Sequence, residues 1–208
     1  MRDTTTTINK TDMYRILTKD MLTPTICRMK VEAPRLARAA QPGQFLIIRA
    51  DEQGERVPLT ISDFDREEGS VTIVTQQIGA STSEICSYEA GDAFADVVGP
   101  LGIPSDFTEM PAEELAGKRY VFIAGGVGTA PVYPQVKWLH AHGAKVDVII
   151  GAKTKDLVIY MPGGPTSSTP LGIRAPIAWN LAGSFKKSTI SCSSAFSSSA
   201  PATSWNRT

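Results

Sequence analysis

An apolar strand that runs directly into a glycine-rich loop and then into a helix is the feature that most restricts the fold of this chain. The run Arg119–Ala124 has the length and apolar composition of a strand in a buried parallel sheet. Glycines follow it, and the helix expected behind them has Pro131 in its first turn, where the missing N–H is tolerated. A second apolar run, Val146–Ile150, predicts the next strand. Units of this kind form right-handed parallel crossovers, so we expect an α/β domain here.

The loop between this strand and helix has the features of a phosphate-binding turn. Glycines at Gly125, Gly126 and Gly128 allow a phosphate to approach the backbone without a Cβ in the way. The helix behind them directs unpaired N–H groups and the positive end of its dipole at the same place. The loop is not a GxGxxG fingerprint, because Pro131 replaces the third glycine, and it lacks the Gly-Lys-Ser/Thr ending of a triphosphate-binding loop. A tight strand–helix turn without a ligand is the alternative interpretation.

The residues before this unit read as short strands separated by turns, with one or two helical turns expected over Ser83–Tyr88. Strands at this spacing, without helices between the early ones, are typical of a small antiparallel barrel. The expected strands are Tyr14–Leu17, Thr25–Val31, Phe45–Arg49 and Val71–Gln76.

Polar residues in this part of the chain are candidates for binding a cofactor. Arg56 could hold a diphosphate with two hydrogen bonds, and Thr60 or Ser62, on the same strand, could bond the edge of a flavin ring through a hydroxyl or backbone group. The turn Gly79-Ala80-Ser81-Thr82 could bind phosphate or flavin oxygens through hydroxyl and N–H groups. The alternatives are structural: an exposed arginine, a strand threonine, and an ordinary helix cap at Ser81 or Thr82. Gly99-Pro100-Leu101-Gly102 is expected to form a rigid turn at a domain junction.

From Arg15 to Tyr160 the chain resembles the ferredoxin–NADP reductase-like flavoproteins, in which an FAD-binding barrel precedes a nicotinamide domain. Within this superfamily it is most similar to the FAD subunit of sulfide dehydrogenase (NADH-dependent ferredoxin:NADP oxidoreductase) and to the electron-transfer subunit of dihydroorotate dehydrogenase B. The segments that carry the resemblance are Pro42-Gly43-Gln44-Phe45, Arg56-Val57-Pro58-Leu59-Thr60-Ile61, Gly99-Pro100-Leu101-Gly102, Gly125–Pro131 and Gly151-Ala152-Lys153-Thr154-Lys155-Asp156.

The resemblance implies an FAD-dependent oxidoreductase subunit that passes electrons between NAD(P)H and an iron–sulfur or ferredoxin-linked partner, a larger catalytic subunit with which it forms a heterodimer. Hydride transfer between a nicotinamide and a flavin needs placement rather than a general base, so no catalytic residue is assigned. The cofactor-binding residues that the resemblance implies are Arg56, Pro58, Leu59, Thr60, Gly79, Ser81 and Thr82 for FAD, and Gly125, Gly126, Gly128 and Thr129 for NAD(P)H.

The composition changes abruptly near residue 160. Residues 1–160 carry 17 Lys+Arg against 21 Asp+Glu, whereas residues 161–208 carry four basic residues, no acidic residue and eleven serines. Such a segment rarely buries enough apolar surface to offset the entropy of ordering it, so we expect a disordered tail. The family that the chain resembles continues its nucleotide domain here and ends in four cysteines that hold a [2Fe–2S] cluster, whereas residues 161–208 contain only Cys192. These ligands are absent, and the pattern predicts a truncated or frameshifted product.

The sequence therefore predicts a β + α/β protein. We expect a six-stranded antiparallel FAD-binding barrel over residues 11–104, an incomplete doubly wound NAD(P)-binding domain over 115–160 and the tail over 161–208. A formal net charge of zero disfavours nucleic-acid binding, and no apolar run approaches the about 18 residues of a membrane span. Three widely separated cysteines favour a reducing, cytoplasmic location. The alternative function is a non-catalytic remnant, a barrel that only binds a partner.

Overall fold

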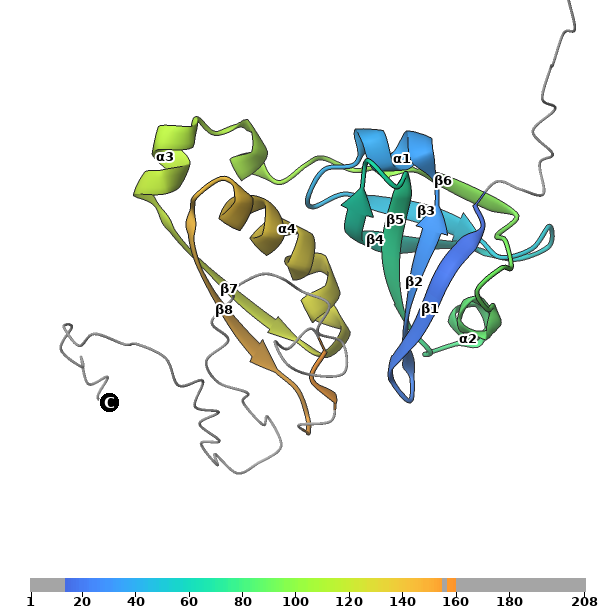
Figure 1. The fold of residues 1–208 in the computed structure, drawn as a ribbon. Helices are drawn as coiled ribbons and strands as arrows, with labels where there is room; N and C mark the ends of the chain where they lie inside the picture. The colour runs from blue at the N-terminus through green and yellow to red at the C-terminus, as the bar shows by residue number, and fades with distance from the viewer. Residues whose placement is uncertain (1–13, 155–156, 160–208) are drawn as a thin grey trace, which may run out of the picture.

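The computed structural model describes residues 14–154 and 157–159, in which a β-barrel is followed by an α/β unit (Figure 1). Both parts confirm the predicted fold class, whereas the predicted tail, residues 161–208, lies outside the described residues. The barrel strands form one antiparallel six-stranded sheet in the order β1-β2-β5-β4-β3-β6. These strands are β1 (Ile16–Thr23), β2 (Ile26–Glu32), β3 (Phe45–Arg49), β4 (Arg56–Asp65), β5 (Ser70–Gln76) and β6 (Asp96–Leu101).

Backbone contacts between the start of β1 and the segment before β6 close this sheet into a barrel. Arg15 forms an antiparallel bridge with Ala93. Next to it, the N–H of Ile16 donates to the carbonyl of Asp92 at 2.8 Å. Because β1 and β6 are the two outer strands of the sheet, this pairing joins its edges, and apolar side chains from all sides fill the interior.

Strand β4 changes its partner halfway along. Residues 56–60 pair with β3 and residues 61–65 pair with β5, with a register shift between Ile61 and Asp63. A bulge of this kind leaves an extra residue, here Ser62, and bends the strand. Pro58 has no N–H to donate and lies in the half that pairs with β3 alone, where a proline is tolerated within a strand. The bulge therefore lets the first half of β4 pair with β3 and the second half pair with β5.

Two segments of the barrel differ from what the sequence pattern predicts. Pro34–Ala39 forms helix α1, which packs on the barrel core, although no helix is expected between the early strands. Gly99-Pro100-Leu101, expected as a turn, is part of β6, where Leu101 pairs with Phe45 and the peptide bond before Pro100 is cis. Both segments depend on contacts with residues distant in sequence, which local periodicity does not report.

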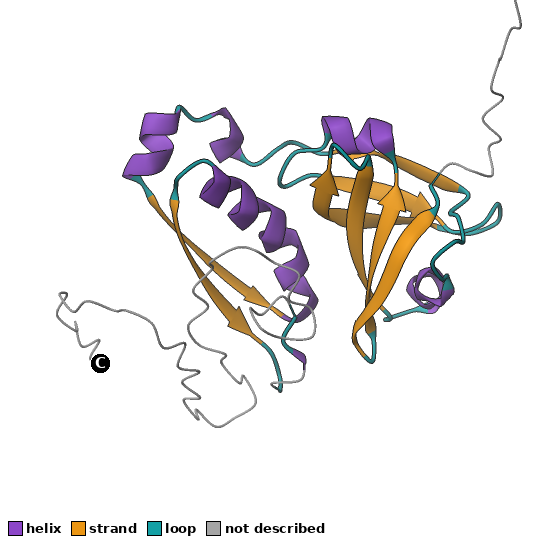
Figure 2. Ribbon diagram, viewed as in Figure 1, coloured by secondary structure: helices purple, strands orange, loops and turns teal. Residues whose placement is uncertain are grey.

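The α/β unit confirms the predicted strand–loop–helix–strand arrangement. Strands β7 and β8 pair in parallel, and helix α4 lies along one face of the pair (Figure 2). The side chains of Val136 and Leu139 on α4 are fully buried. The elements are a 3-10 turn (Asp106–Glu109), α3 (Ala112–Gly117), β7 (Arg119–Gly125), the 3-10 turn η3 (Gly126–Gly128), α4 (Thr129–Ala141) and β8 (Lys145–Gly151).

The face of β7 away from α4 is exposed among the described residues. Val121 is 58% exposed and Ile123 is 77% exposed, whereas Val148 and Ile150 on β8 are buried. The apolar run of β7 was expected to be covered on both faces, and the described part of the chain covers one of them. No helix in the described ranges combines the length and apolar character that crossing a membrane requires.

Cys27 of β2 and Cys86 of α2 (Ala80–Ser87) meet inside the barrel. Their Sγ atoms lie 2.6 Å apart, and both side chains are buried. The contact with the Cys86 sulfur and, second, burial raise the pKa of the Cys27 thiol. The sequence separates the two cysteines by 59 residues, so their contact depends on the packing of α2 against the sheet.

We expect both cysteines to be inert in the folded protein, because neither side chain is accessible to a reagent. Iodoacetamide at about pH 8 should leave both peptides unmodified, as mass spectrometry after digestion would show. After unfolding without a reductant, both cysteines should be alkylated. Peptides that stay unmodified in the unfolded chain would reveal a disulfide and contradict the expectation.

Gly43, in the turn before β3, occupies a position that a larger residue does not fit. Its φ of +91° lies in the left-handed region. An added Cβ would lie 2.5 Å from the hydroxyl oxygen of Ser105 and 3.0 Å from its backbone nitrogen. Ser105 is held in place because its N–H donates to the carbonyl of Pro42 at 2.9 Å. The turn before β3 is therefore held against the linker that joins the barrel to the α/β unit.

We expect Gly43→Ala to lower the free energy of unfolding by about 1–3 kcal/mol, since the alanine adopts a strained backbone and meets a fixed neighbour. Gly117→Ala in α3 is the matched control, because no atom lies within 4 Å of the added Cβ. Reduced entropy of the unfolded chain should leave that control at least as stable as the parent. Urea unfolding followed by circular dichroism measures both, and equal stabilities would contradict the expectation.

Candidate cofactor-binding site

The structure brings together the two barrel segments that the sequence singles out. Glu55 immediately precedes β4, and its carboxylate accepts a hydrogen bond from the hydroxyl of Ser81 in α2. This contact joins the segment that begins at Arg56 to the segment Gly79–Thr82, although more than twenty residues separate them in the sequence. The candidate FAD residues therefore lie on adjoining parts of one surface of the barrel.

Arg56 is anchored but accessible. Its Nη1 donates to Oδ2 of Asp96, the first residue of β6, at 3.0 Å, and its side chain is 53% exposed. Exposed ion pairs of this kind contribute about 1 kcal/mol or less, so a diphosphate can compete with Asp96 for the guanidinium. On the same strand Pro58 is exposed, Leu59 packs against the core, and Thr60 is half-buried.

In the turn before α2, the Thr82 hydroxyl makes its hydrogen bonds within the turn itself. The Thr82 hydroxyl accepts the N–H groups of Ile78 and Gly79 at 3.0 and 3.1 Å and donates to the Gly79 carbonyl at 3.1 Å. The N-cap of α2 is Gly79 rather than Ser81 or Thr82, and Thr82, three residues later, bonds back to the Gly79 backbone. A Cβ placed on Gly79 would meet nothing within 4 Å. The open backbone at Gly79 and the first N–H groups of α2 are then what this turn offers to a ligand.

The glycine-rich loop leaves its backbone open to a ligand. Gly126 has a φ of +53°, and a Cβ on Gly126 or Gly128 would meet nothing within 4 Å. Gly125 differs, because it pairs with Gly151 in the parallel ladder and an added Cβ would lie 3.4 Å from the Gly151 carbonyl oxygen. Gly126 and Gly128 are therefore the positions at which a phosphate can approach the chain.

Thr129, the first residue of α4, carries a buried hydroxyl with no partner. The residue is 3% exposed, and no hydrogen bond to its Oγ1 is formed within the described structure. A buried hydroxyl left unpaired costs about 1–3 kcal/mol. It lies at the N-terminus of a 13-residue helix, where free N–H groups and the helix dipole favour an anion. The loop and this hydroxyl together fit the diphosphate of a nucleotide cofactor.

The glycine-rich loop packs against the barrel. Val127 of the loop and Ala130 of α4 contact an apolar cluster on the barrel, formed by Leu22, Ile26 and Val74. Val74 is on β5, and the chain reaches Gly79 shortly after β5 ends at Gln76. The loop and the Gly79 turn therefore lie near the same end of β5, so the two predicted binding regions face one junction.

Sequence reasoning missed the acidic residues that hold these candidates in place. Glu55 bonds Ser81, and Asp96 bonds Arg56. A charged pair at the start of β4, Glu55 and Arg56, was the available signal, but their partners come from α2 and β6. Only the fold shows which charges meet.

Comparison with known proteins gives close relatives, although no family model matches the chain. An uncharacterized protein of Clostridium beijerinckii, named for the adh 3′ region, is 57% identical over 148 residues, which are 71% of this chain and 50% of that protein. The dihydroorotate dehydrogenase B (NAD(+)) electron transfer subunit homolog of Thermotoga maritima is 37% identical over 151 residues, 73% of this chain and 51% of that protein. The chain thus spans about half the length of the curated relatives it matches.

A solved structure supports the same relationship. The NADH-dependent reduced ferredoxin–NADP oxidoreductase, a structure that gives insight into flavin-based electron bifurcation, matches with a TM-score of 0.64 and 35% identity. The match covers 72% of this chain and 51% of that one. Together with the order of the barrel and the α/β unit, these likenesses show that the chain is related, over about half of their length, to the NADH-dependent reduced ferredoxin–NADP oxidoreductase and to the dihydroorotate dehydrogenase B electron transfer subunits.

Proposed function

We propose that this chain is an FAD-dependent electron-transfer subunit that passes electrons between NAD(P)H and an iron–sulfur or ferredoxin-linked partner subunit. The observation that carries the proposal is the junction of two binding surfaces. One is the barrel surface around Arg56, and the other is the open loop that ends at the unpartnered hydroxyl of Thr129. The names of related proteins, which are electron transfer subunits, support it.

On the barrel, each candidate residue has a physical role in holding FAD. The half-exposed guanidinium of Arg56 would bind the diphosphate with charge-assisted hydrogen bonds. Pro58 and Thr60 would line the flavin ring with their side chains, and Leu59, whose side chain packs against the core, would do so through its backbone. The backbone at Gly79, with the neighbouring Ser81 and Thr82, would close the other side, and Ser81 is already tied to β4 through Glu55.

On the α/β unit, the loop would hold the nucleotide. Gly126 and Gly128 would bring the backbone close to the diphosphate, Gly125 would hold the loop against Gly151, and the Thr129 hydroxyl would gain the partner it lacks within the described structure. Bound FAD supplies the chemistry, because a flavin accepts hydride from a nicotinamide and releases electrons singly. The chain's own contribution is to orient the two cofactors and to exclude water between them, which needs no general base.

The partner and location follow the same reasoning. A larger catalytic subunit with a flavin or iron–sulfur centre is the partner that an electron transfer subunit requires, and a heterodimer is the expected assembly. The odd number of widely separated cysteines is consistent with a cytoplasmic location, where thiols are kept reduced. A yellow purified protein with a flavin spectrum would support the proposal, and a colourless one that cannot be loaded with FAD would favour a barrel that only binds a partner.

We expect Arg56→Ala to weaken FAD binding by about tenfold to a hundredfold, because it removes a charge-assisted hydrogen bond worth about 1.5–3 kcal/mol. Arg119→Ala is the matched control, since Arg119 is also exposed and paired with an aspartate, Asp147, but lies on β7. Titration of both apoproteins with FAD, followed by flavin fluorescence, gives the affinities. Equal affinities in the two variants would exclude Arg56 as the diphosphate ligand.

We expect Thr129→Val to weaken nucleotide binding by about tenfold or more without lowering stability. Valine keeps the shape of the side chain, and the unliganded protein loses no hydrogen bond because the hydroxyl has no partner. Thr129→Ser keeps the hydroxyl and should keep the affinity. Calorimetric titration of the FAD-loaded variants with NAD⁺ and NADP⁺, with thermal unfolding in parallel, tests this. A destabilised Thr129→Val variant with unchanged affinity would show that the hydroxyl is structural.

A further inference from the structure

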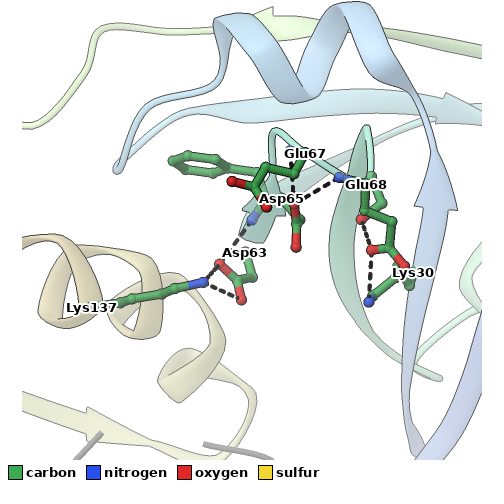
Figure 3. A network of polar contacts seen from close by, with 8 residues as sticks. Lys30, Asp63, Asp65, Glu67, Glu68 and Lys137 are labelled. Carbon is green, nitrogen blue, oxygen red and sulfur yellow. Dashed lines mark hydrogen bonds and ion pairs between the residues drawn. The ribbon is translucent and has the colours of Figure 1, made fainter. Parts of the chain in front are cut away.

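An ion pair joins the α/β unit to the barrel at a distance from the glycine-rich loop. Nζ of Lys137 on α4 lies 2.7 Å from Oδ1 and 2.9 Å from Oδ2 of Asp63 on β4 (Figure 3). The side chains are 43% and 26% exposed, so the pair is partly shielded from water. Both carboxylate oxygens contact the ammonium group, and the two residues are separated by 74 positions in the sequence.

The fold directs Asp63 at α4. The bulge at Ser62 places Asp63 in the second half of β4, beyond the point where the strand changes partner. The backbone N–H of Phe64 donates to Oδ1 of Asp63 at 2.9 Å, which orients the carboxylate. Asp63 is therefore a fixed acceptor on the barrel rather than a mobile surface side chain.

Acidic residues surround the end of the hairpin that Lys137 approaches. Asp65 accepts the N–H groups of Glu67 and Glu68, both at 2.9 Å, and Glu68 pairs with Lys30 at 2.8 Å (Figure 3). These N–H groups and then nearby lysines, Lys137 among them, lower the pKa of Asp65. Lys137 is thus attracted by the whole hairpin, and Asp63 provides the directional contact.

The ion pair is one of several attachments of α4 outside its own sheet, because the helix also packs along β4 and Oε1 of Gln135 accepts a hydrogen bond from the hydroxyl of Ser105 in the linker at 3.2 Å. Another is apolar, at the start of the helix, where Ala130 packs on the apolar cluster of the barrel. Lys137 lies seven residues later, about 10 Å along the helix axis. Apolar packing alone lets a helix shift slightly on a sheet, whereas a directional contact to β4 about two turns from Ala130 restricts that shift. A shift at Ala130 would move the loop Gly126–Thr129, which precedes it directly.

We propose that the Lys137–Asp63 ion pair positions the loop Gly126–Thr129 against the barrel and thereby sets the approach of the nicotinamide to the flavin. Lys137 is a positioning residue, because it acts through the orientation of α4. The role in hydride transfer rests on the function proposed above, whereas the fixed angle between α4 and the barrel does not.

The first test measures that geometry without any cofactor. Spin labels are attached at Arg38→Cys in the barrel and Lys145→Cys in the α/β unit, both exposed positions, with Cys192→Ser to prevent labelling elsewhere. Cys27 and Cys86 are buried and stay unlabelled. Pulsed electron paramagnetic resonance should give one narrow distance distribution for the parent, and Lys137→Met and Asp63→Asn should broaden or shift it. Lys137→Arg should keep it narrow, and so should Arg119→Met, which removes an ion pair within the α/β unit.

The second test measures the consequence for electron transfer. In anaerobic stopped-flow mixing with NADH and with NADPH, we expect Lys137→Met and Asp63→Asn to lower the limiting rate of flavin reduction by about tenfold to a hundredfold, the effect of misplacement by about 1 Å. FAD affinity should be unchanged, and Lys137→Arg should restore most of the rate. The double variant should be no slower than either single variant, because both remove one interaction.

The outcomes separate the inference from the proposed function. Distance distributions that are the same in Lys137→Met and the parent overturn the inference, whether or not FAD binds. A parent protein that binds no FAD, or is reduced by neither nucleotide, overturns the proposed function and leaves the distance measurement to decide the role of the ion pair. Altered distances with an unchanged limiting rate would remove the role in hydride transfer.

Discussion

Helix α4 packs against two sheets at once, and the relation between the two parts of the chain depends on that double contact. One side buries Val136 and Leu139 against β7, β8 and the neighbouring segments. The other side contacts the barrel through Ala130 and through Lys137. The loop that begins the helix cannot shift relative to its own sheet without also shifting relative to the barrel. A phosphate-binding turn is thereby carried to the junction instead of facing open solvent.

Strand β4 has the corresponding role on the barrel. Its first half, from Arg56 to Thr60, carries the candidate FAD residues and pairs with β3, and its second half carries Asp63 and pairs with β5. The bulge at Ser62 lies between these two halves of the strand. Because the strand is continuous, the candidate FAD residues and the acceptor for Lys137 keep a constant separation, so the barrel offers α4 a reference position next to the proposed FAD site.

The Thr82 and Thr129 hydroxyls, one in each candidate binding region, differ in the number of hydrogen bonds that they make. The Thr82 hydroxyl has three hydrogen bonds within its own turn, whereas the Thr129 hydroxyl is buried with none in the described structure. Buried polar groups are normally paired, yet the buried hydroxyls of Ser62 and Thr75 in the barrel also lack a partner in the described structure, so what distinguishes Thr129 is its position beside the open glycines at the start of α4. Both are small-residue turns at a helix N-terminus, and the hydrogen bonds distinguish them more sharply than their sequences do.

The sequence by itself determined the elements whose pattern is local: the strands with alternating or continuous apolar residues, and the unit β7–α4–β8 with its glycine loop. It also carried the motifs by which the chain resembles the ferredoxin–NADP reductase-like flavoproteins. Only the tertiary structure decided that Gly99–Leu101 is a strand, that Arg56 meets Asp96, and that Lys137 meets Asp63. Periodicity reports which face of a segment is apolar. It does not report which distant charge lies opposite, because that depends on strand order, on the bulge in β4 and on the path of the linker.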